Sequence, residues 1–107
     1  MSSRTGDVYD LLIVGSGGAG MAAAIRASEL GATAAIVEGG EGVGGTCVNV
    51  GCIPSKYLIE AAHRYHTARR GFPGISPSEP DLNWTEILRQ KEAIVEDLRR
   101  EKYLDVL

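Results

Sequence analysis

The stretch YDLLIVGSGGAG, residues 9–20, decides the fold of this chain. Its first half, residues 9–14, is a short and mostly apolar run that ends at a glycine, which is typical of a buried parallel strand. The alanine-rich residues 18–30 that follow predict a helix, which Gly31 should end. Residues 34–37, AAIV, predict a second buried strand. These elements form one βαβ unit of about 30 residues with a right-handed crossover.

The loop between the first strand and the helix matches the pattern G-x-G-x-x-G. In this setting Gly15 permits the tight turn, Gly17 lets the backbone approach a pyrophosphate, and Gly20 lets the helix pack close to the strand. The helix N-terminus offers free N–H groups to an anion. Glu38, at the end of the second strand, suits the ribose of FAD or NAD and would repel the 2′-phosphate of NADP. The alternative is a plain tight turn followed by a solvated glutamate.

The rest of the chain is predicted to be largely helical. A flexible connection over residues 39–45 leads into a helical element from about 46 to 69, which contains Gly51 and Pro54. Residues 71–81 form a loop, and a long helix begins at Asn83. Its predicted apolar face consists of Trp84, Ile87, Leu88, Ile94, Val95 and Leu98. The opposite side carries Glu86, Arg89, Glu96, Arg100 and Glu101.

Composition limits the class of protein. The chain has 107 residues with 44% apolar and 23% charged residues, as in one small globular domain. A net charge of −3 without a basic patch argues against a nucleic-acid partner. The first residues lack the features of a secretory signal, and the uncharged run over residues 11–25 is too short to span a bilayer. We therefore expect a cytoplasmic protein without a membrane partner, where a structural disulfide is disfavoured.

The two cysteines lie in GGTCVNVGCIPSK, residues 44–56, and three interpretations compete for them. They could be structural, or they could bind zinc with His63 and His66, although the spacing between those histidines is shorter than usual. Third, Cys47 and Cys52 could form a redox-active disulfide. Five residues apart in a regular helix, their Cα atoms would be about 8.7 Å apart, whereas a disulfide needs less than about 7 Å.

A disulfide therefore requires a distorted helix, and the motif contains residues that distort helices. Gly51 tolerates unusual dihedral angles, and Pro54 lacks an N–H and clashes with the preceding turn. A helix N-terminus would favour a thiolate. Lys56, four residues after Cys52, should lie on the same helix face and act in the same direction. The alternative for Lys56 is a solvated surface lysine.

Taken together, VYDLLIVGSGGAG, Glu38 and GGTCVNVGCIPSK resemble the FAD-dependent pyridine nucleotide–disulfide oxidoreductases. The resemblance implies an α/β fold: the N-terminal portion of a Rossmann-like FAD-binding domain, with βαβ followed by two long helices. It implies that Cys52 is the charge-transfer thiol, Cys47 the interchange thiol, and Lys56 a neighbour of the flavin. The implied cofactor-binding residues are Gly15, Ser16, Gly17, Gly18, Ala19, Gly20, Glu38, Gly45, Thr46, Cys52 and Lys56.

Within that family, residues 55–66 and 95–107 are most similar to the mercuric reductase branch. The resemblance then implies that NADPH reduces FAD, that the flavin opens the Cys47–Cys52 bridge, and that Hg(II) held by these thiolates leaves as Hg(0). Soft sulfur suits this soft metal. The alternative is a dihydrolipoyl dehydrogenase-like enzyme acting on a small disulfide or dithiol. The family also implies a homodimer for the full-length enzyme.

The resemblance assigns residues 1–107 to the first part of the FAD/NAD(P)-binding domain. The remaining FAD-binding, NAD(P)-binding and dimerisation segments are not in this sequence. We therefore expect that the isolated chain does not oxidise NADPH in response to mercury. Two parallel strands alone do not make a stable sheet, which also indicates that the chain is the N-terminal part of a larger protein. A non-catalytic nucleotide-binding fragment is the further alternative.

Overall fold

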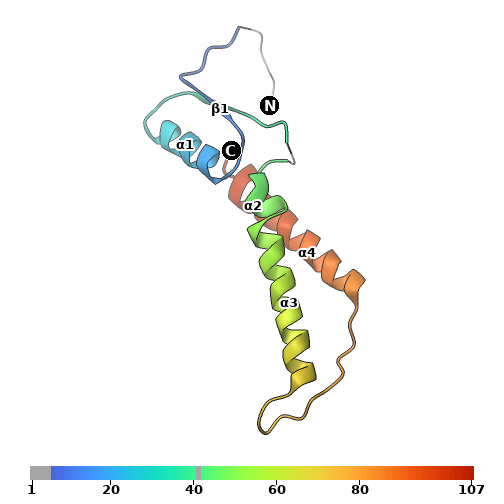
Figure 1. The fold of residues 1–107 in the computed structure, drawn as a ribbon. Coiled ribbons are helices and arrows are strands. Elements are labelled where there is room, and N and C mark those ends of the chain that lie inside the picture. Colours follow the sequence, from blue (N-terminus) through green and yellow to red (C-terminus); the bar gives the residue numbers. More distant parts are fainter. Residues whose placement is uncertain (1–5, 41) are drawn as a thin grey trace.

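The computed structural model describes residues 6–40 and 42–107. Residues 1–5 of the predicted start and Glu41 of the predicted connection lie outside the described residues. The chain order is β1 (Leu11–Val14), α1 (Gly18–Glu29), β2 (Ala34–Val37), α2 (Gly45–Asn49), α3 (Cys52–Arg70), α4 (Trp84–Arg99) and a π-helical turn, η1 (Arg100–Leu104). The predicted α/β fold, a βαβ unit followed by two long helices, is confirmed (Figure 1).

The two strands pair in parallel, with Leu11 opposite Ala34 and Val14 opposite Val37. At the start of the pair, the Thr33 N–H donates to Asp10 Oδ2 at 2.8 Å, and the Asp10 N–H donates to Thr33 Oγ1 at 3.0 Å. These two bonds fix the register of β1 against β2. The strands therefore end side by side, and the loops that carry the site leave from the same edge.

Helix α1 ends at the predicted place by a well-defined backbone motif. The Gly31 N–H donates to Ser28 O and the Ala32 N–H donates to Ala27 O, at 3.0 and 2.9 Å. Gly31 has a φ of +77°, which a glycine adopts without strain. This motif turns the chain sharply into β2.

The prediction of two buried strands is only partly correct. Ile13 and Ile36 are buried, but Leu12 is 62% exposed and Val14 is 85% exposed. Alternate side chains of a strand point to opposite faces, and α1 packs on one face only. In the described residues, the other face of the two-stranded sheet is therefore open to solvent.

An apolar cluster joins the βαβ unit to the C-terminal segment. It contains Ile13, Met21 and Ile36, and the partly buried Ala24, Ala34 and Tyr103 pack against it. Tyr103 belongs to η1, so the π-helical turn brings the C-terminal segment back onto the βαβ unit. Figure 1 shows the red C-terminal end beside α1 and α2.

The single helical element predicted over residues 46–69 is in fact two helices. α2 ends at Asn49, Val50 and Gly51 leave helical geometry, and α3 begins at Cys52. Pro54 therefore lies in the first turn of α3, where its missing N–H costs no helical hydrogen bond. The first bond of that kind runs from the Ser55 N–H to Gly51 O at 3.0 Å. Pro54 thus fits a helix start and does not distort a continuing helix.

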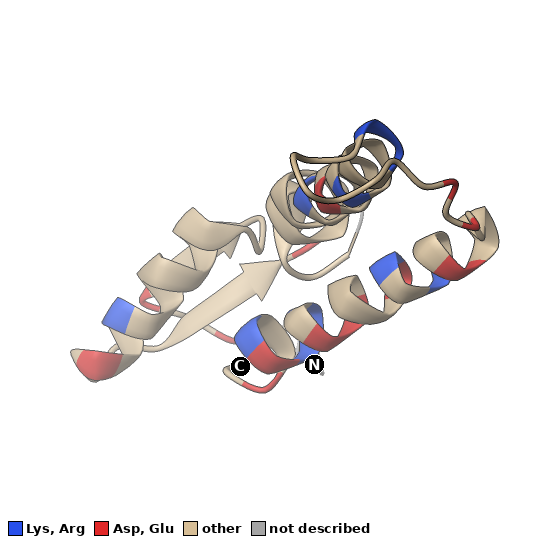
Figure 2. Ribbon diagram, turned by 90° about the horizontal axis from the view of Figure 1, so that it is seen from below, with Lys and Arg blue, Asp and Glu red and all other residues tan. Residues whose placement is uncertain are grey.

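The predicted loop over residues 71–81 and the helix after it are confirmed. Asn83 caps α4, since its Oδ1 accepts from the Glu86 N–H at 3.0 Å. Val95 is buried on the predicted apolar face, but Trp84 at the start of α4 is 55% exposed. The predicted charged side is exposed, and acidic and basic residues alternate along it (Figure 2).

The molecule is elongated, because α3 and α4 run side by side away from the βαβ unit. Its radius of gyration is 20.0 Å, whereas a compact domain of this length has about 13 Å. In the described part of the chain, none of the helices combines the length and apolar character needed to cross a membrane.

Candidate active site at the glycine loop and the cysteine pair

The glycine loop has the geometry that its pattern predicts. Gly15 has a φ of +101°, and its N–H donates to Val37 O at 2.8 Å, which joins the turn to the end of β2. A Cβ at Gly20 would lie 2.2 Å from Gly15 O and 3.2 Å from Ile13 Cγ2. Only glycine fits there, so the roles predicted for Gly15 in the turn and Gly20 in helix–strand packing are confirmed.

The N-terminus of α1 suits an anion. Gly17 is its N-cap, and in the described residues this helix end has neither a side-chain cap nor an acidic residue in its first turn. The first helical bond runs from the Met21 N–H to Gly17 O at 2.9 Å. The N–H groups of Gly18, Ala19 and Gly20 therefore have no acceptor within the helix and are directed toward the loop. These features fit the pyrophosphate of a dinucleotide.

Ser16 ties this loop to the end of β2 and to the segment before the cysteines. It is 1% exposed. Its Oγ donates to Glu38 Oε1 at 2.6 Å and accepts from the Gly44 N–H at 3.2 Å. The Ser16 hydrogen bond is the main cause that lowers the pKa of Glu38, and the Gly40 N–H, 3.1 Å from Oε2, acts in the same direction. These hydrogen bonds favour the ionised form of Glu38.

The glycine loop touches the start of the cysteine motif. A Cβ at Gly45 would lie 2.7 Å from Gly17 Cα, so the two backbones approach more closely than a side chain would allow. Gly45 also has a φ of +73°. Thr46 follows Gly45 in α2 and is exposed. The predicted nucleotide loop and the predicted redox motif therefore form one continuous surface, to which Gly17, Gly45 and Thr46 contribute backbone.

The two cysteines lie on either side of the break between α2 and α3. Cys47 is the third residue of α2, and Cys52 is the first residue of α3. Both are exposed free thiols in this structure. Gly51 makes the break possible in two ways. Its φ of −109° and ψ of −117° lie outside the common backbone regions, as predicted from its tolerance of unusual dihedral angles. A Cβ there would also lie 2.9 Å from Thr46 O and 3.2 Å from Cys47 Cα.

The thiols influence one another directly. The hydrogen bond with the Cys52 side chain is the main cause that raises the pKa of Cys47, and the charge of Cys52 adds to it. The positive charge of Lys56 acts in the opposite direction. The effect of Cys52 on the pKa of Cys47 therefore outweighs the opposite effect of Lys56.

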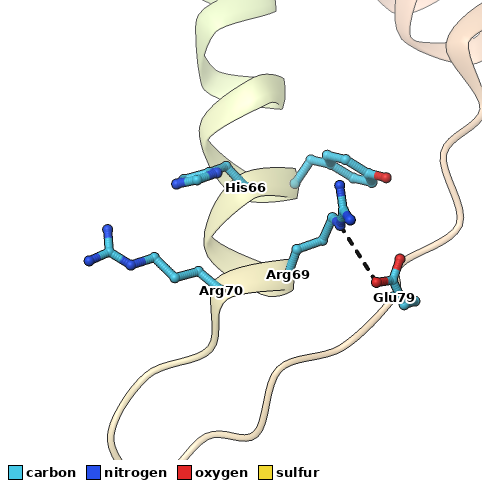
Figure 3. A pocket seen from close by; sticks show the side chains of 5 residues that line it. His66, Arg69, Arg70 and Glu79 are labelled. Atoms are coloured by element: carbon cyan, nitrogen blue, oxygen red, sulfur yellow. Dashed lines mark ion pairs between the residues drawn. The ribbon is translucent and has the colours of Figure 1, made fainter.

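The histidines do not join the cysteines. His63 lies eleven residues after Cys52 in the same helix, which separates them by about 16 Å along its axis. His66 lines a hollow of about 400 Å³ at the far end of α3, together with Tyr65, Arg69, Arg70 and Glu79. The Arg69 guanidinium lies 5.6 Å from the centre of the Tyr65 ring and pairs with Glu79 at 3.6 Å. Figure 3 shows His66 and Arg70 directed away from Arg69 and Glu79. In the described residues, groups of three or more metal-ligating side chains are not found.

Sequence reasoning missed Asn49 and Arg99. Arg99 Nε donates to Asn49 Oδ1 at 2.7 Å, which joins the end of α4 to the end of α2. Asn49 lies inside the cysteine motif, at the end of a short helix with glycines on both sides. An asparagine in such a place was the available signal. Arg99 had none, because it is one of several charged residues near the end of a helix.

Comparison with known proteins agrees with this geometry. The family model of the pyridine nucleotide-disulphide oxidoreductases matches residues 9–106. The chain belongs to the pyridine nucleotide-disulphide oxidoreductase family. Among curated members it is 46% identical to a mercuric reductase of Staphylococcus aureus over 98% of this chain, and 49% identical to one of Serratia marcescens over 89%.

The chain spans only about a fifth of these relatives, 19% of the first and 21% of the second. Among solved structures, the HOCl-induced flavoprotein disulfide reductase RclA of Escherichia coli, in its Cu(II) complex, is similar with a TM-score of 0.69 and 27% identity. That match covers 89% of this chain and 18% of RclA. The family therefore accounts for both the βαβ unit and the helix pair.

Proposed function

We propose that this chain is the N-terminal part of the FAD-binding domain of a mercuric reductase. Cys47 and Cys52 are its redox-active pair. The observation that carries the proposal is their arrangement: Cys47 in α2 and Cys52 at the start of α3 flank the helix break, and Gly45, two residues before Cys47, packs against Gly17 of the glycine loop. The identities of 46% and 49% to mercuric reductases support the choice within the family.

The residues of the loop fit FAD. The N–H groups of Gly18, Ala19 and Gly20 would bind its pyrophosphate, with Gly15, Ser16 and Gly17 shaping the turn. Glu38 would accept hydrogen bonds from the ribose, because Ser16 and Gly40 each occupy only part of the acceptor capacity of its two oxygens. Gly45 and Thr46 would lie along the cofactor. When bound, FAD would supply two electrons at a time, received from NADPH.

The cysteine pair performs the thiol chemistry. The Cys47–Cys52 disulfide takes up two electrons and two protons and opens to two thiols. As thiolates these sulfurs are good ligands for the soft ion Hg(II), and two further electrons convert the bound ion to Hg(0), which leaves. Lys56 stabilises negative charge at the pair, since its charge favours the thiolate of Cys47.

The whole enzyme is proposed to be a homodimer in the cytoplasm, with Hg(II) as its substrate. The glycine loop, Glu38 and the cysteine pair are the parts that this chain contributes. Its share of about a fifth of the relatives agrees with the expectation that the chain alone does not turn over.

The experiment that tests the proposal uses Hg(II) and the reduced chain. Titration of the dithiol form with HgCl₂ is followed by the ultraviolet thiolate-to-mercury absorption, and we expect saturation at one Hg(II) per chain. Cys47→Ser and Cys52→Ser should each bind far more weakly in the presence of a competing monothiol, because one sulfur ligand is lost. Equal binding by the single variants would contradict the proposal.

A second measurement separates mercury from a disulfide substrate. In the full-length enzyme, NADPH consumption is compared with Hg(II) and with a small cyclic disulfide as acceptors. Turnover with mercury alone supports the proposal, whereas turnover with the disulfide alone would assign the chain to the dihydrolipoyl dehydrogenase-like branch.

A further inference from the structure

We infer that Arg99 is a positioning residue for the cysteine pair and that it acts through Asn49. The inference rests on the proposed function of Cys47 and Cys52 as a redox pair. Arg99 is the last residue of α4, 50 residues after Asn49, and it touches neither thiol in the hydrogen bonds of the described structure. Its effect on the pair is therefore transmitted by the asparagine.

Asn49 holds the segment that leads into α2. Its Nδ2 donates to Gly45 O at 2.8 Å and lies 3.3 Å from both Gly42 O and Val43 O. Its Oδ1 accepts from Arg99 Nε at 2.7 Å. Every polar atom of this side chain is thus engaged, and the group is partly buried.

The arrangement requires an amide at this position. Arginine only donates hydrogen bonds, so the oxygen of Asn49 must face Arg99. The NH₂ group must then face the three carbonyls. An aspartate has the same shape but would place an oxygen against those carbonyls, which repel it. Arg99 therefore fixes which way the amide points, and the amide fixes the backbone.

The segment held in this way has little intrinsic order. Gly42, Gly44 and Gly45 have φ values of +116°, +109° and +73°, and α2 has only five residues. A helix this short is not stable by itself, and glycines lose much conformational entropy when they are fixed. Cys47 lies in the middle of α2, so its position opposite Cys52 depends on contacts from outside the helix.

Arg99 is a rigid point from which to provide such a contact. The π-helical turn after it carries Tyr103 to the core formed by Ile13, Met21 and Ile36. A Cβ at Gly44 would lie 3.4 Å from the Tyr103 ring, which shows that this ring also borders the loop before α2. The end of α4 is therefore anchored to the βαβ unit on one side and to the cysteine motif on the other.

The test is the thiol–disulfide equilibrium of the full 107-residue chain with glutathione. The reaction converts two cysteine thiols and one oxidised glutathione into the Cys47–Cys52 disulfide and two reduced glutathione molecules. The equilibrium constant measures how closely the protein holds the two thiols together. Mass spectrometry after acid quenching and alkylation gives the fraction oxidised without any flavin.

Arg99→Met keeps the apolar stem but removes the donor. We expect its equilibrium constant to fall about tenfold, the effect of one hydrogen bond to a charged group. Arg89→Gln is the matched control, since Arg89 pairs with Glu86 on the exposed side of α4, and it should stay within about twofold of the wild type. An Arg99→Met value equal to that of the control would overturn the inference.

Asn49→Asp separates positioning from charge. Loss of positioning lowers the equilibrium constant, whereas an added negative charge near the thiols disfavours thiolates and raises it. A decrease supports the inference and an increase overturns it. If Arg99→Met loses helical circular dichroism, Arg99→Lys replaces it, because lysine keeps the charge but has a different donor geometry. We expect the equilibrium constant of Arg99→Lys to fall about tenfold as well. A wild-type chain that forms no intramolecular disulfide would instead overturn the proposed function.

Discussion

The Ser16 hydroxyl lies 2.6 Å from Glu38 Oε1 and is the donor of that hydrogen bond, although 22 residues separate the two in sequence. Ser16 Oγ also accepts a hydrogen bond from the Gly44 N–H. One buried hydroxyl therefore connects the nucleotide loop, the acidic end of β2 and the approach to the cysteines. A substitution at Ser16 should therefore alter the structure of all three segments.

Ser16→Ala should destabilise the chain by about 1–3 kcal/mol, because the buried Gly44 N–H loses its acceptor. Glu38 should also titrate closer to its ordinary pKa. Since its folded pKa is lowered, Glu38 contributes stability above its unfolded pKa, and this is lost as pH falls through the folded value. The stability deficit of Ser16→Ala should therefore be largest at neutral pH and shrink in acid.

Urea unfolding followed by helical circular dichroism at several pH values measures this deficit. Ser28→Ala, an exposed serine on α1, is the control and should change little. A deficit that stays the same from neutral pH to pH 3 would show that the Ser16–Glu38 bond has no thermodynamic effect.

Gly20→Ala should strongly destabilise the βαβ unit. The added Cβ would lie 2.2 Å from Gly15 O, and such an overlap costs about 1–3 kcal/mol or more. Gly18→Ala, two residues earlier in the same helix, has no atom within 4 Å of the added Cβ and should be neutral or slightly stabilising. The comparison uses urea midpoints, and equal midpoints would argue against close packing of α1 on β1.

Cys52→Ala should make Cys47 more reactive near neutral pH. The hydrogen bond with Cys52 is the main cause of the raised pKa of Cys47, so its loss shifts the thiol toward its ordinary value. The pH profile of iodoacetamide alkylation at Cys47, read by peptide mass spectrometry, should then move to lower pH. Lys56→Met should move it to higher pH, because Lys56 favours the thiolate. An unchanged Cys47 profile in Cys52→Ala would mean that the thiols do not interact.

Glu86 should titrate far below an ordinary glutamate. Its hydrogen bonds with Arg89 and Gln90 lower its pKa to about 2. The Glu86–Arg89 pair therefore stabilises α4 above about pH 4, and this stabilisation is lost as pH falls toward 2. Carbon-detected NMR of the side-chain carboxyl gives the value directly. In Arg89→Gln the pKa of Glu86 should rise toward that of a free glutamate. A pKa that stays near 2 would mean that Arg89 is not its cause and that the capped start of α4 at Asn83 lowers it instead.

The βαβ unit was predictable because each of its signals is local. The apolar run, the glycine spacing and the Gly31 stop each act within a few residues, and the structure places β1, α1 and β2 close to the predicted bounds. Exposure was less predictable, since whether Val14 is covered depends on what packs on the second face of the sheet. Sequence periodicity indicates which residues tend to be buried, but it does not indicate which helix or strand would cover them.

The candidate site also combines features that local sequence predicts with features that it does not. The roles of Gly15 and Gly20 follow from dihedral angle and space, and the structure shows both. The break at Val50 and Gly51 was expected only as a distortion, because Pro54 at a helix start and Pro54 within a helix look alike in sequence. The bond between Asn49 and Arg99 spans 50 residues, and one sequence holds no signal for such a pairing.

The placement of Tyr103 on the N-terminal core has a consequence for biosynthesis. Residues 9–52 leave the ribosome first, so both cysteines reach the cell's thiol pool before α4 and η1 exist. During that interval Cys47 and Cys52 sit on an unsupported nascent segment, free to form mixed disulfides with glutathione. The bond from Arg99 to Asn49, which we infer positions the thiols, forms only after α4 has been synthesised.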